Sequence, residues 1–148
     1  MTVRTIEQPS CFRSRHNTGA ADIIRGKILT PSTSEVDGCA LATSATASFC
    51  GVSVETMQGS TNGVRTRSAQ ISGVAAVIPG AQIAIGDKLT SDSTGRAVVA
   101  TTGDTVVGTA RTAASAAVTT FSLETAVEVE LGEQSQVASS GSLRCLKM

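Results

Sequence analysis

The sequence predicts an all-β protein, and three observations lead to this prediction. Short apolar runs rich in Val, Ile and Thr follow one another from Lys27 onward. Gly, Ser, Asp or Pro interrupts these runs at the spacing expected of turns between short strands. The sequence GKILT at residues 26–30 returns as GDKLT at residues 86–90, sixty positions later. We therefore expect one all-β domain built from two degenerate β repeats.

The repeat continues at smaller offsets. Gly38 aligns with Gly95 and Gly51 with Gly108, both fifty-seven positions apart. At an offset of fifty-four, residues 64–68 align with 118–122, and Gly73, Ala75 and Val77 align with Val127, Val129 and Leu131. The offset falls by three residues at a time, at Ser/Gly-rich stretches, which indicates that loops were shortened between retained strands. The alternative is chance alignment, because so simple a composition matches itself in many registers.

The chain is expected to have three parts. Residues 1–25 have no sustained period and are interrupted by Pro9 and Gly19, so they predict an extended N-terminal arm that becomes ordered against a partner. The β domain follows at residues 26–132, with repeat halves at about 26–78 and 83–131. Residues 133–148 are expected to form a polar loop and a C-terminal tail.

Within the second half the elements follow in order. Residues 83–99 predict a hairpin in which Gly95 supplies a positive φ. Residues 105–110 predict a strand that Gly108 bends or bulges. Residues 112–117 are Ala-rich but too few to form a stable helix alone. Strict alternation in VEVEL, residues 127–131, predicts a strand with two Val and one Leu on its core face and two Glu on the other.

The expected core consists of small residues. The 148-residue chain has no Trp or Tyr and only three Phe. A buried Val or Leu contributes roughly 1.5–3 kcal/mol and Ala much less, so a lone copy is expected to be only modestly stable. Assembly with further copies would bury more apolar area.

Charge and cysteine patterns argue against several classes of function. Twelve basic and twelve acidic residues balance, so the chain lacks the basic footprint of direct nucleic-acid binding. It has no secretory signal and no apolar run long enough to span a membrane, so we expect synthesis in a reducing cytoplasm and no membrane partner. The four cysteines lack the spacing of a metal site, and we expect no metal and no cofactor. They are expected to be free and mostly buried, a Cys11–Cys145 bridge being the alternative.

Catalysis has little support in the sequence. The single histidine, His16, lies in the predicted arm, where a Ser-His-Asp or Cys-His arrangement is difficult to build. Asp87 and Asp104 each follow a Gly and precede an apolar run, which is the ordinary composition of a β-turn. No Gly-rich loop leads from a strand into a helix. We expect no catalytic residues and no enzyme.

The candidate interaction residues are aromatic and cationic. An aromatic anchor flanked by Arg is typical of interface hot spots, which points to four arm residues, Arg4, Phe12, Arg13 and Arg15. Arg65 and Arg67 lie on one face of a predicted strand, where two guanidinium groups can hold a partner's carboxylates in bidentate fashion. A solvated strand face is the alternative for this pair.

Three motifs in residues 83–131 support a resemblance. They are a GDKL turn at 86–89, a GRAVVA hairpin at 95–100 and a VGTA strand at 107–110. Together they resemble the phage capsid cement proteins, also called head decoration proteins. Residues 26–29 and 38–41 carry the same pattern more weakly. The chain departs from it in a Ser/Thr-rich insertion between Leu41 and Gly51 and in its Cys-containing tail.

The resemblance implies a compact β-barrel or β-tulip-like domain. It also implies a non-enzymatic homotrimer on the outer surface of an icosahedral phage head, made in the host cytoplasm and carried in the virion. Such a protein bridges subunits of the major capsid protein and stabilises the expanded shell. One alternative is a trimeric β-rich spike or fibre module that binds a host glycan, although the chain lacks the Trp and Tyr that stack on sugar rings. Another is a β-rich trimeric hydrolase with a site between subunits that uses Asp87, Asp104 or Arg111.

Overall fold

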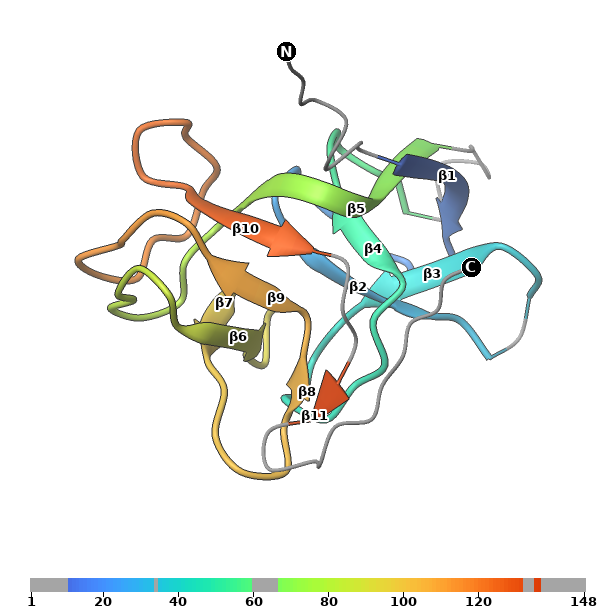
Figure 1. Cartoon of the computed structure of the whole chain (residues 1–148). Helices are drawn as coiled ribbons and strands as arrows, with labels where there is room; N and C mark the ends of the chain where they lie inside the picture. Colours follow the sequence, from blue (N-terminus) through green and yellow to red (C-terminus); the bar gives the residue numbers. More distant parts are fainter. Residues whose placement is uncertain (1–10, 34, 60–66, 132–134, 137–148) are drawn as a thin grey trace, which may run out of the picture.

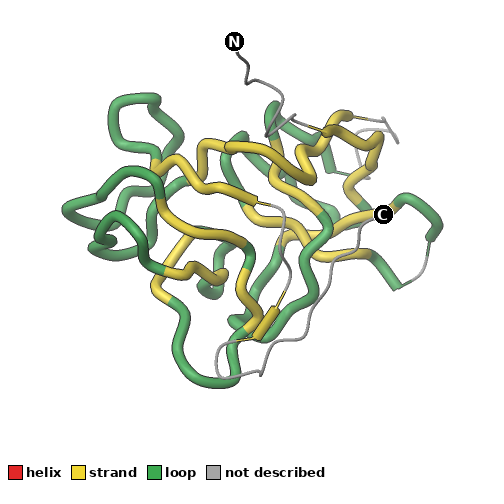
Figure 2. The backbone as a smooth tube through the Cα atoms, viewed as in Figure 1, coloured by secondary structure: helices red, strands yellow, loops and turns green. Residues whose placement is uncertain are grey.

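The computed structural model describes residues 11–33, 35–59, 67–131 and 135–136. All regular secondary structure in these ranges is β, which confirms the predicted fold class (Figure 2). No helix in this part of the chain is long and apolar enough to cross a membrane.

The strands of the described ranges form one large sheet and one small pair (Figure 1). In chain order they are β1 (Cys11–Asn17), β2 (Ile28–Pro31), β3 (Gly38–Leu41), β4 (Gly51–Ser53), β5 (Arg67–Val77), β6 (Lys88–Ser91), β7 (Ala97–Val99), β8 (Thr105–Val106), β9 (Gly108–Ala110), β10 (Val127–Leu131) and β11 (Ser135–Gln136). The large sheet has the order β1-β3-β2-β4-β5-β10-β9-β6-β7, and β11 pairs with β8.

The large sheet curls into two rings that share β5. In the first, β1 pairs with both β3 and β5, so β1-β3-β2-β4-β5 closes on itself. In the second, β5-β10-β9-β6-β7 is closed by a bridge from Pro79, just after β5, to Ala97. Gly73, with a φ of 86°, divides β5 into a part that pairs with β1 and a part that pairs with β10. We call the rings the first barrel, residues 11–72, and the second barrel, residues 73–131.

Matching hydrogen bonds confirm that the two barrels are copies of one unit. Ile23 and Met57 exchange two backbone hydrogen bonds of 2.9 and 2.7 Å, and Ile83 and Ala114 exchange two of 2.9 Å. These pairs stand sixty and fifty-seven positions apart in the sequence, as the predicted alignment requires. Gly51 pairs with Leu29 and Gly108 with Leu89 at the offsets that the sequence indicated.

The predicted alignment is wrong by one residue in the hairpins. Thr30 pairs with Ala40 in the first barrel and Thr90 with Val98 in the second, so these strands correspond at an offset of fifty-eight. The counterpart of Gly95, whose φ is 80°, is therefore Asp37, whose φ is 61°. Asp tolerates this left-handed backbone better than most residues, so the turn survives without glycine.

The alignment at an offset of fifty-four is also wrong. Val52 of β4 pairs with Gln70, whereas Thr109 of β9 pairs with Glu130, so β10 corresponds to the first part of β5 sixty positions earlier. The residues that had been aligned with Val127, Val129 and Leu131 are instead their antiparallel partners, Val77, Ala75 and Gly73. Adjacent strands of one barrel share the same alternation of small residues, which explains the false match.

Residues 11–17 of the predicted arm are extended, as predicted, and form β1 within the first barrel. The parallel pairing of Asn17 with Cys39 corresponds to the bridge between Pro79 and Ala97. The first repeat therefore begins in β1, before residue 26. Residues 1–10 lie outside the described part of the chain.

The predicted elements of the second half are present. β6 and β7 form the hairpin, and Gly95 supplies its positive φ. β8 and β9 are separated at Val107, next to the predicted bend at Gly108. β10 alternates buried and more exposed residues, with both Val and Leu131 buried. Residues 112–117 form no helix, and of the predicted tail the structure describes only 135–136, which form β11.

Buried apolar residues form two clusters. The larger one fills the second barrel, with Val77, Leu89 and Val129 among its members. The smaller one fills the first barrel and consists of Ile23, Leu29, Cys39, Cys50, Met57 and Ala69. At the positions equivalent to Cys39, Cys50 and Met57, the second barrel has Ala97, Val107 and Ala114.

Candidate interaction surface

The predicted interaction residues in the described part of the chain lie on β1 and at the start of β5. Phe12 is 52% exposed, which is unusual for a large apolar side chain. Arg13, the next residue in the strand, is also exposed. They pair with Gln70 and Ala69 of β5. Both side chains are therefore accessible, and as successive residues of a strand they point to opposite faces of β1. Arg4 and Arg65 lie outside the described residues.

Arg15 and Arg67, predicted from separate segments, are brought together. They face one another as partners in the β1–β5 ladder. The side chain of Arg15 is only 17% exposed, and its Nη1 lies 3.6 Å from Oδ1 of Asp37. Its Nε is buried and has no hydrogen-bond partner among the described residues. Arg15 therefore belongs largely to the interior of the first barrel, at the position equivalent to Val77.

The hairpin of β2 and β3, which we call the first hairpin, is tied to β1 by a second polar contact. His16 Nε2 lies 2.5 Å from Oε1 of Glu35, whose side chain is half exposed. His16 N also donates to the carbonyl of Asp37, over 3.1 Å. These contacts hold the end of the hairpin, residues 35–37, against β1.

The environment of the two thiols inside the first barrel disfavours their ionisation. Burial, with a smaller contribution from Cys50, raises the pKa of Cys39 to about 12. Burial also raises the pKa of Cys50 to about 11, although the nearby Arg15 cation opposes both shifts. Cys39 and Cys50 are free and buried, as predicted, whereas Cys11 is free and exposed. Cys145 lies outside the described residues, so the alternative bridge is untested.

The aspartates weighed as catalytic candidates serve their own turns. Asp87 Oδ2 accepts a 2.9 Å hydrogen bond from Ala84 N, and Asp104 Oδ2 accepts one of 2.8 Å from Thr101 N. Arg111 instead lies near Glu130, at 3.5 Å. Over the described ranges, no three His, Cys, Asp or Glu side chains gather closely enough to hold a metal ion.

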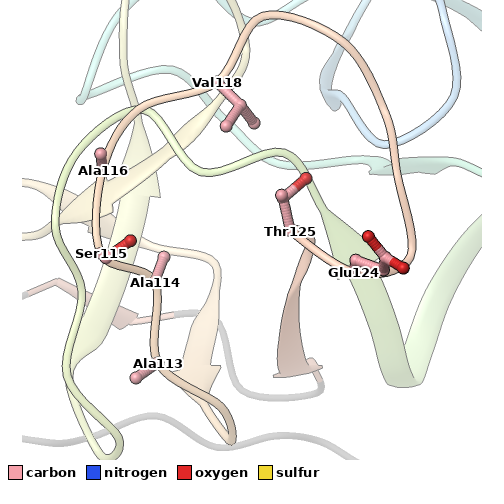
Figure 3. A pocket seen from close by; sticks show the side chains of 7 residues that line it. All are labelled: Ala113, Ala114, Ser115, Ala116, Val118, Glu124 and Thr125. Atoms are coloured by element: carbon pink, nitrogen blue, oxygen red, sulfur yellow. The ribbon is translucent and has the colours of Figure 1, made fainter.

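One pocket of about 190 Å³ lies beside the second barrel. Figure 3 shows the loop of residues 113–118 on one side of it and Glu124 and Thr125 on the other. Three of its seven lining residues are alanine, and Glu124 is its single titratable residue. The pocket can accept a small group.

Sequence reasoning missed three exposed apolar side chains. Val36 is 87% exposed, Leu123 73% and Ile85 71%, all within turns. A large apolar residue flanked by polar or glycine turn residues is the signal that could have identified them. Exposed apolar side chains at turns are available to a partner.

No protein-family profile and no curated protein matches the chain. Among solved structures, the chain is similar to the head fiber gp8.5 N base in bacteriophage phi29, with a TM-score of 0.59 and 18% sequence identity. The match covers 83% of this chain and 94% of that one. The two proteins therefore share a fold over nearly the whole of the phage domain.

Proposed function

We propose that this protein is a structural component of a phage head, a homotrimeric decoration protein that binds the outer surface of the capsid. The observation that carries the proposal is the fold shared with a phage head-fiber base over 94% of that chain. The cement-protein motifs of residues 86–110 point to the same class independently. It is proposed to act without catalysis, cofactor, nucleic acid or membrane.

The proposed mechanism is differential binding. A decoration protein that contacts neighbouring major capsid protein subunits in the expanded lattice binds this state better than the immature one. Binding then lowers the free energy of the expanded shell by mass action. The exposed Phe12 and Arg13 are the proposed anchors, because an aromatic ring and a guanidinium group are the residue types typical of interface hot spots.

A fibre base is the second candidate. The structural neighbour is described as the base of a head fiber, and in this candidate function the chain forms a platform between a capsid and a further projecting segment. The two candidates share capsid binding and differ in what the opposite face of the protein carries. The host-glycan alternative has no comparable observation in its favour.

Point substitutions test the capsid contact better than a truncation, because removal of β1 would open the first barrel. We expect the double variant Phe12→Ala, Arg13→Glu to bind expanded heads at least about tenfold more weakly, the effect of losing one hot spot. Leu123→Ala, at another exposed apolar residue, is the control and should bind normally. Unchanged occupancy of the double variant in cosedimentation would remove β1 from the proposed contact.

A further inference from the structure

The two barrels of one chain join through a defined contact. The hairpin of β6 and β7, which we call the second hairpin, ends in residues 94–96. This end meets the turn that precedes β2 in the first barrel. Lys27 Nζ donates to the carbonyl of Thr94 over 2.8 Å, and Ile28 N donates to the carbonyl of Gly95 over 2.8 Å. An added Cβ on Gly95 would stand 2.5 Å from Leu41 Cδ1, so hairpin and turn are in close contact.

Apolar residues seal this contact. Ile28, Ala42 and Val52 belong to the first barrel but pack in the core cluster of the second. Phe121 and Ile78 cover Gly26, where an added Cβ would lie 2.6 and 3.1 Å from their nearest atoms. The Arg25 guanidinium lies 4.3 Å from the centre of the Phe121 ring. The turn of the first barrel is thus covered by the second.

The equivalent turn of the second barrel is open. Gly86 has a backbone φ close to that of Gly26, 93° against 89°, yet no atom of the described residues lies within 4 Å of an added Cβ. Ile85, the counterpart of Arg25, is 71% exposed, and Val99, the counterpart of Leu41, is 41% exposed. Lys88 replaces Ile28 and is exposed. We call residues 85–88 together with Val99 the open corner.

The equivalent hairpin end of the first barrel is also uncovered. Val36 and Asp37 occupy the positions of Thr94 and Gly95, and Val36 is 87% exposed. The carboxylates of Glu35 and Asp37 are about half exposed. We call residues 35–37 the acidic tip. In Figure 1 the loop between β2 and β3, which contains the tip, lies at the right, whereas the loop that leads into β6, which contains the open corner, lies at the left.

We propose that the open corner of one copy binds the acidic tip of a second copy, so that the contact between the two barrels of a chain is repeated between chains. The internal contact joins Ile28 N to the carbonyl of Gly95, so the equivalent contact between copies brings the backbone of Lys88 to that of Asp37. The exposed side chain of Lys88 can then approach the half-exposed carboxylate of Asp37, which also lies 3.6 Å from Arg15. Val36 meets Ile85 and Val99, so apolar contact accompanies the ion pair. A charged version of the contact suits copies that must remain soluble before they meet.

The surfaces that meet are different, so the association is head to tail and generates a ring or an open chain of copies. In a homotrimer, it would arrange six barrels in one ring. The inference rests on the self-association part of the proposed function and not on capsid binding. Its test uses purified protein without capsids, so that the two can fail separately.

The test uses one variant of each surface and their mixture. The corner variant Ile85→Asp, Lys88→Glu presents acids to the acidic tip, and the tip variant Val36→Asp places a third carboxylate where Val36 would meet Ile85 and Val99. The two altered surfaces carry the same charge, so they repel each other in a mixture. We expect light scattering to show a threefold lower mass for each variant than for the wild type, that of a single 15.0 kDa chain. Each variant retains one intact surface, so their equimolar mixture should form a one-to-one pair of twice that mass and no larger species.

Leu123→Asp, at an exposed apolar residue outside both surfaces, is the control and should assemble like the wild type. Formation of the mixed pair also shows that both variants are folded. A wild type that stays a single chain at high concentration would overturn the inference. So would wild-type mass in either variant, or a mixture that forms no pair.

Discussion

The two barrels share one path of the chain but differ in what fills and what covers them. Val77, Ala97 and Val107 line the second barrel, where the first has Arg15, Cys39 and Cys50. The turn at Gly26 is covered by the other barrel, whereas the turn at Gly86 is open. The two barrels therefore kept the same backbone hydrogen bonds. Their side chains differ because one barrel has its turn covered by the other, whereas the turn of the second barrel is open.

The largest expected effect on stability comes from placing an arginine in the second barrel at the position equivalent to Arg15. Val77 is fully buried, and Val77→Arg places a charge in an apolar core without a partner. We expect a loss of at least about 3 kcal/mol in free energy of unfolding, measured in urea. Arg15→Val is the matched control and should cost less than about 1 kcal/mol, because it removes a half-satisfied cation. Equal losses would mean that the two interiors do not differ as described.

The next effect compares the equivalent glycines. A side chain at either positive φ costs roughly 1–2 kcal/mol, so Gly86→Ala should lose about that amount. Gly26→Ala must also displace the Phe121 ring, which should add at least about 1 kcal/mol. Thermal unfolding of both variants measures the difference. Similar losses would contradict the close contact between the barrels.

The hairpin ends differ in their response to acid. Asp92 is partly buried, which opposes ionisation, but hydrogen bonds from the backbone of Arg96 and Thr94 and from the Arg96 side chain lower its pKa overall. Its stabilisation is therefore present above the usual pKa of 3.8 and is lost as the pH falls through the lower folded value. Asp92→Asn should cost roughly 1.5 kcal/mol at pH 7 and progressively less below pH of about 4.

Asp37→Asn in the first hairpin is the control for this measurement. The Asp37 side chain is 54% exposed and has a single 3.6 Å ion pair, so the change should cost under about 1 kcal/mol. Urea unfolding from pH 2 to pH 7 measures both variants. A cost of Asp92→Asn that stays constant over this range would refute the proposed ionic role.

The smallest effect concerns the thiols and alters reactivity rather than stability. With pKa values raised to about 12 and 11, Cys39 and Cys50 carry little thiolate at pH 8. Iodoacetamide should therefore label the exposed Cys11 well before either of them, as followed by mass spectrometry of peptides. Unfolded protein, in which all thiols should react alike, is the control. Equal labelling rates in the folded state would contradict the closed first barrel.

The fold class, the hairpin of the second barrel and β10 could be predicted because their signals are local. Alternating residues and turn glycines fix these elements without reference to the rest of the chain. The role of β1 could not be predicted this way. Its sequence, CFRSRHN, lacks apolar alternation, and only pairing with strands far along the chain makes it a strand of the first barrel.

The exposure of the candidate residues could be predicted in part for the same reason. Phe12 and Arg13 can be singled out by residue type alone, and both are exposed, whereas their role as contacts stays a prediction. The burial of Arg15 follows from its equivalence to Val77, which requires the correct register of the repeat. The open corner and acidic tip depend on that register too, and small residues that align in several ways conceal it from the sequence.

The most direct test of the proposed role is cosedimentation of the purified protein with expanded and unexpanded phage heads that lack it. Saturable binding to expanded heads, with little binding to unexpanded ones, is the result that the proposal predicts. A folded protein that sediments with neither kind of head would contradict a role on the phage head.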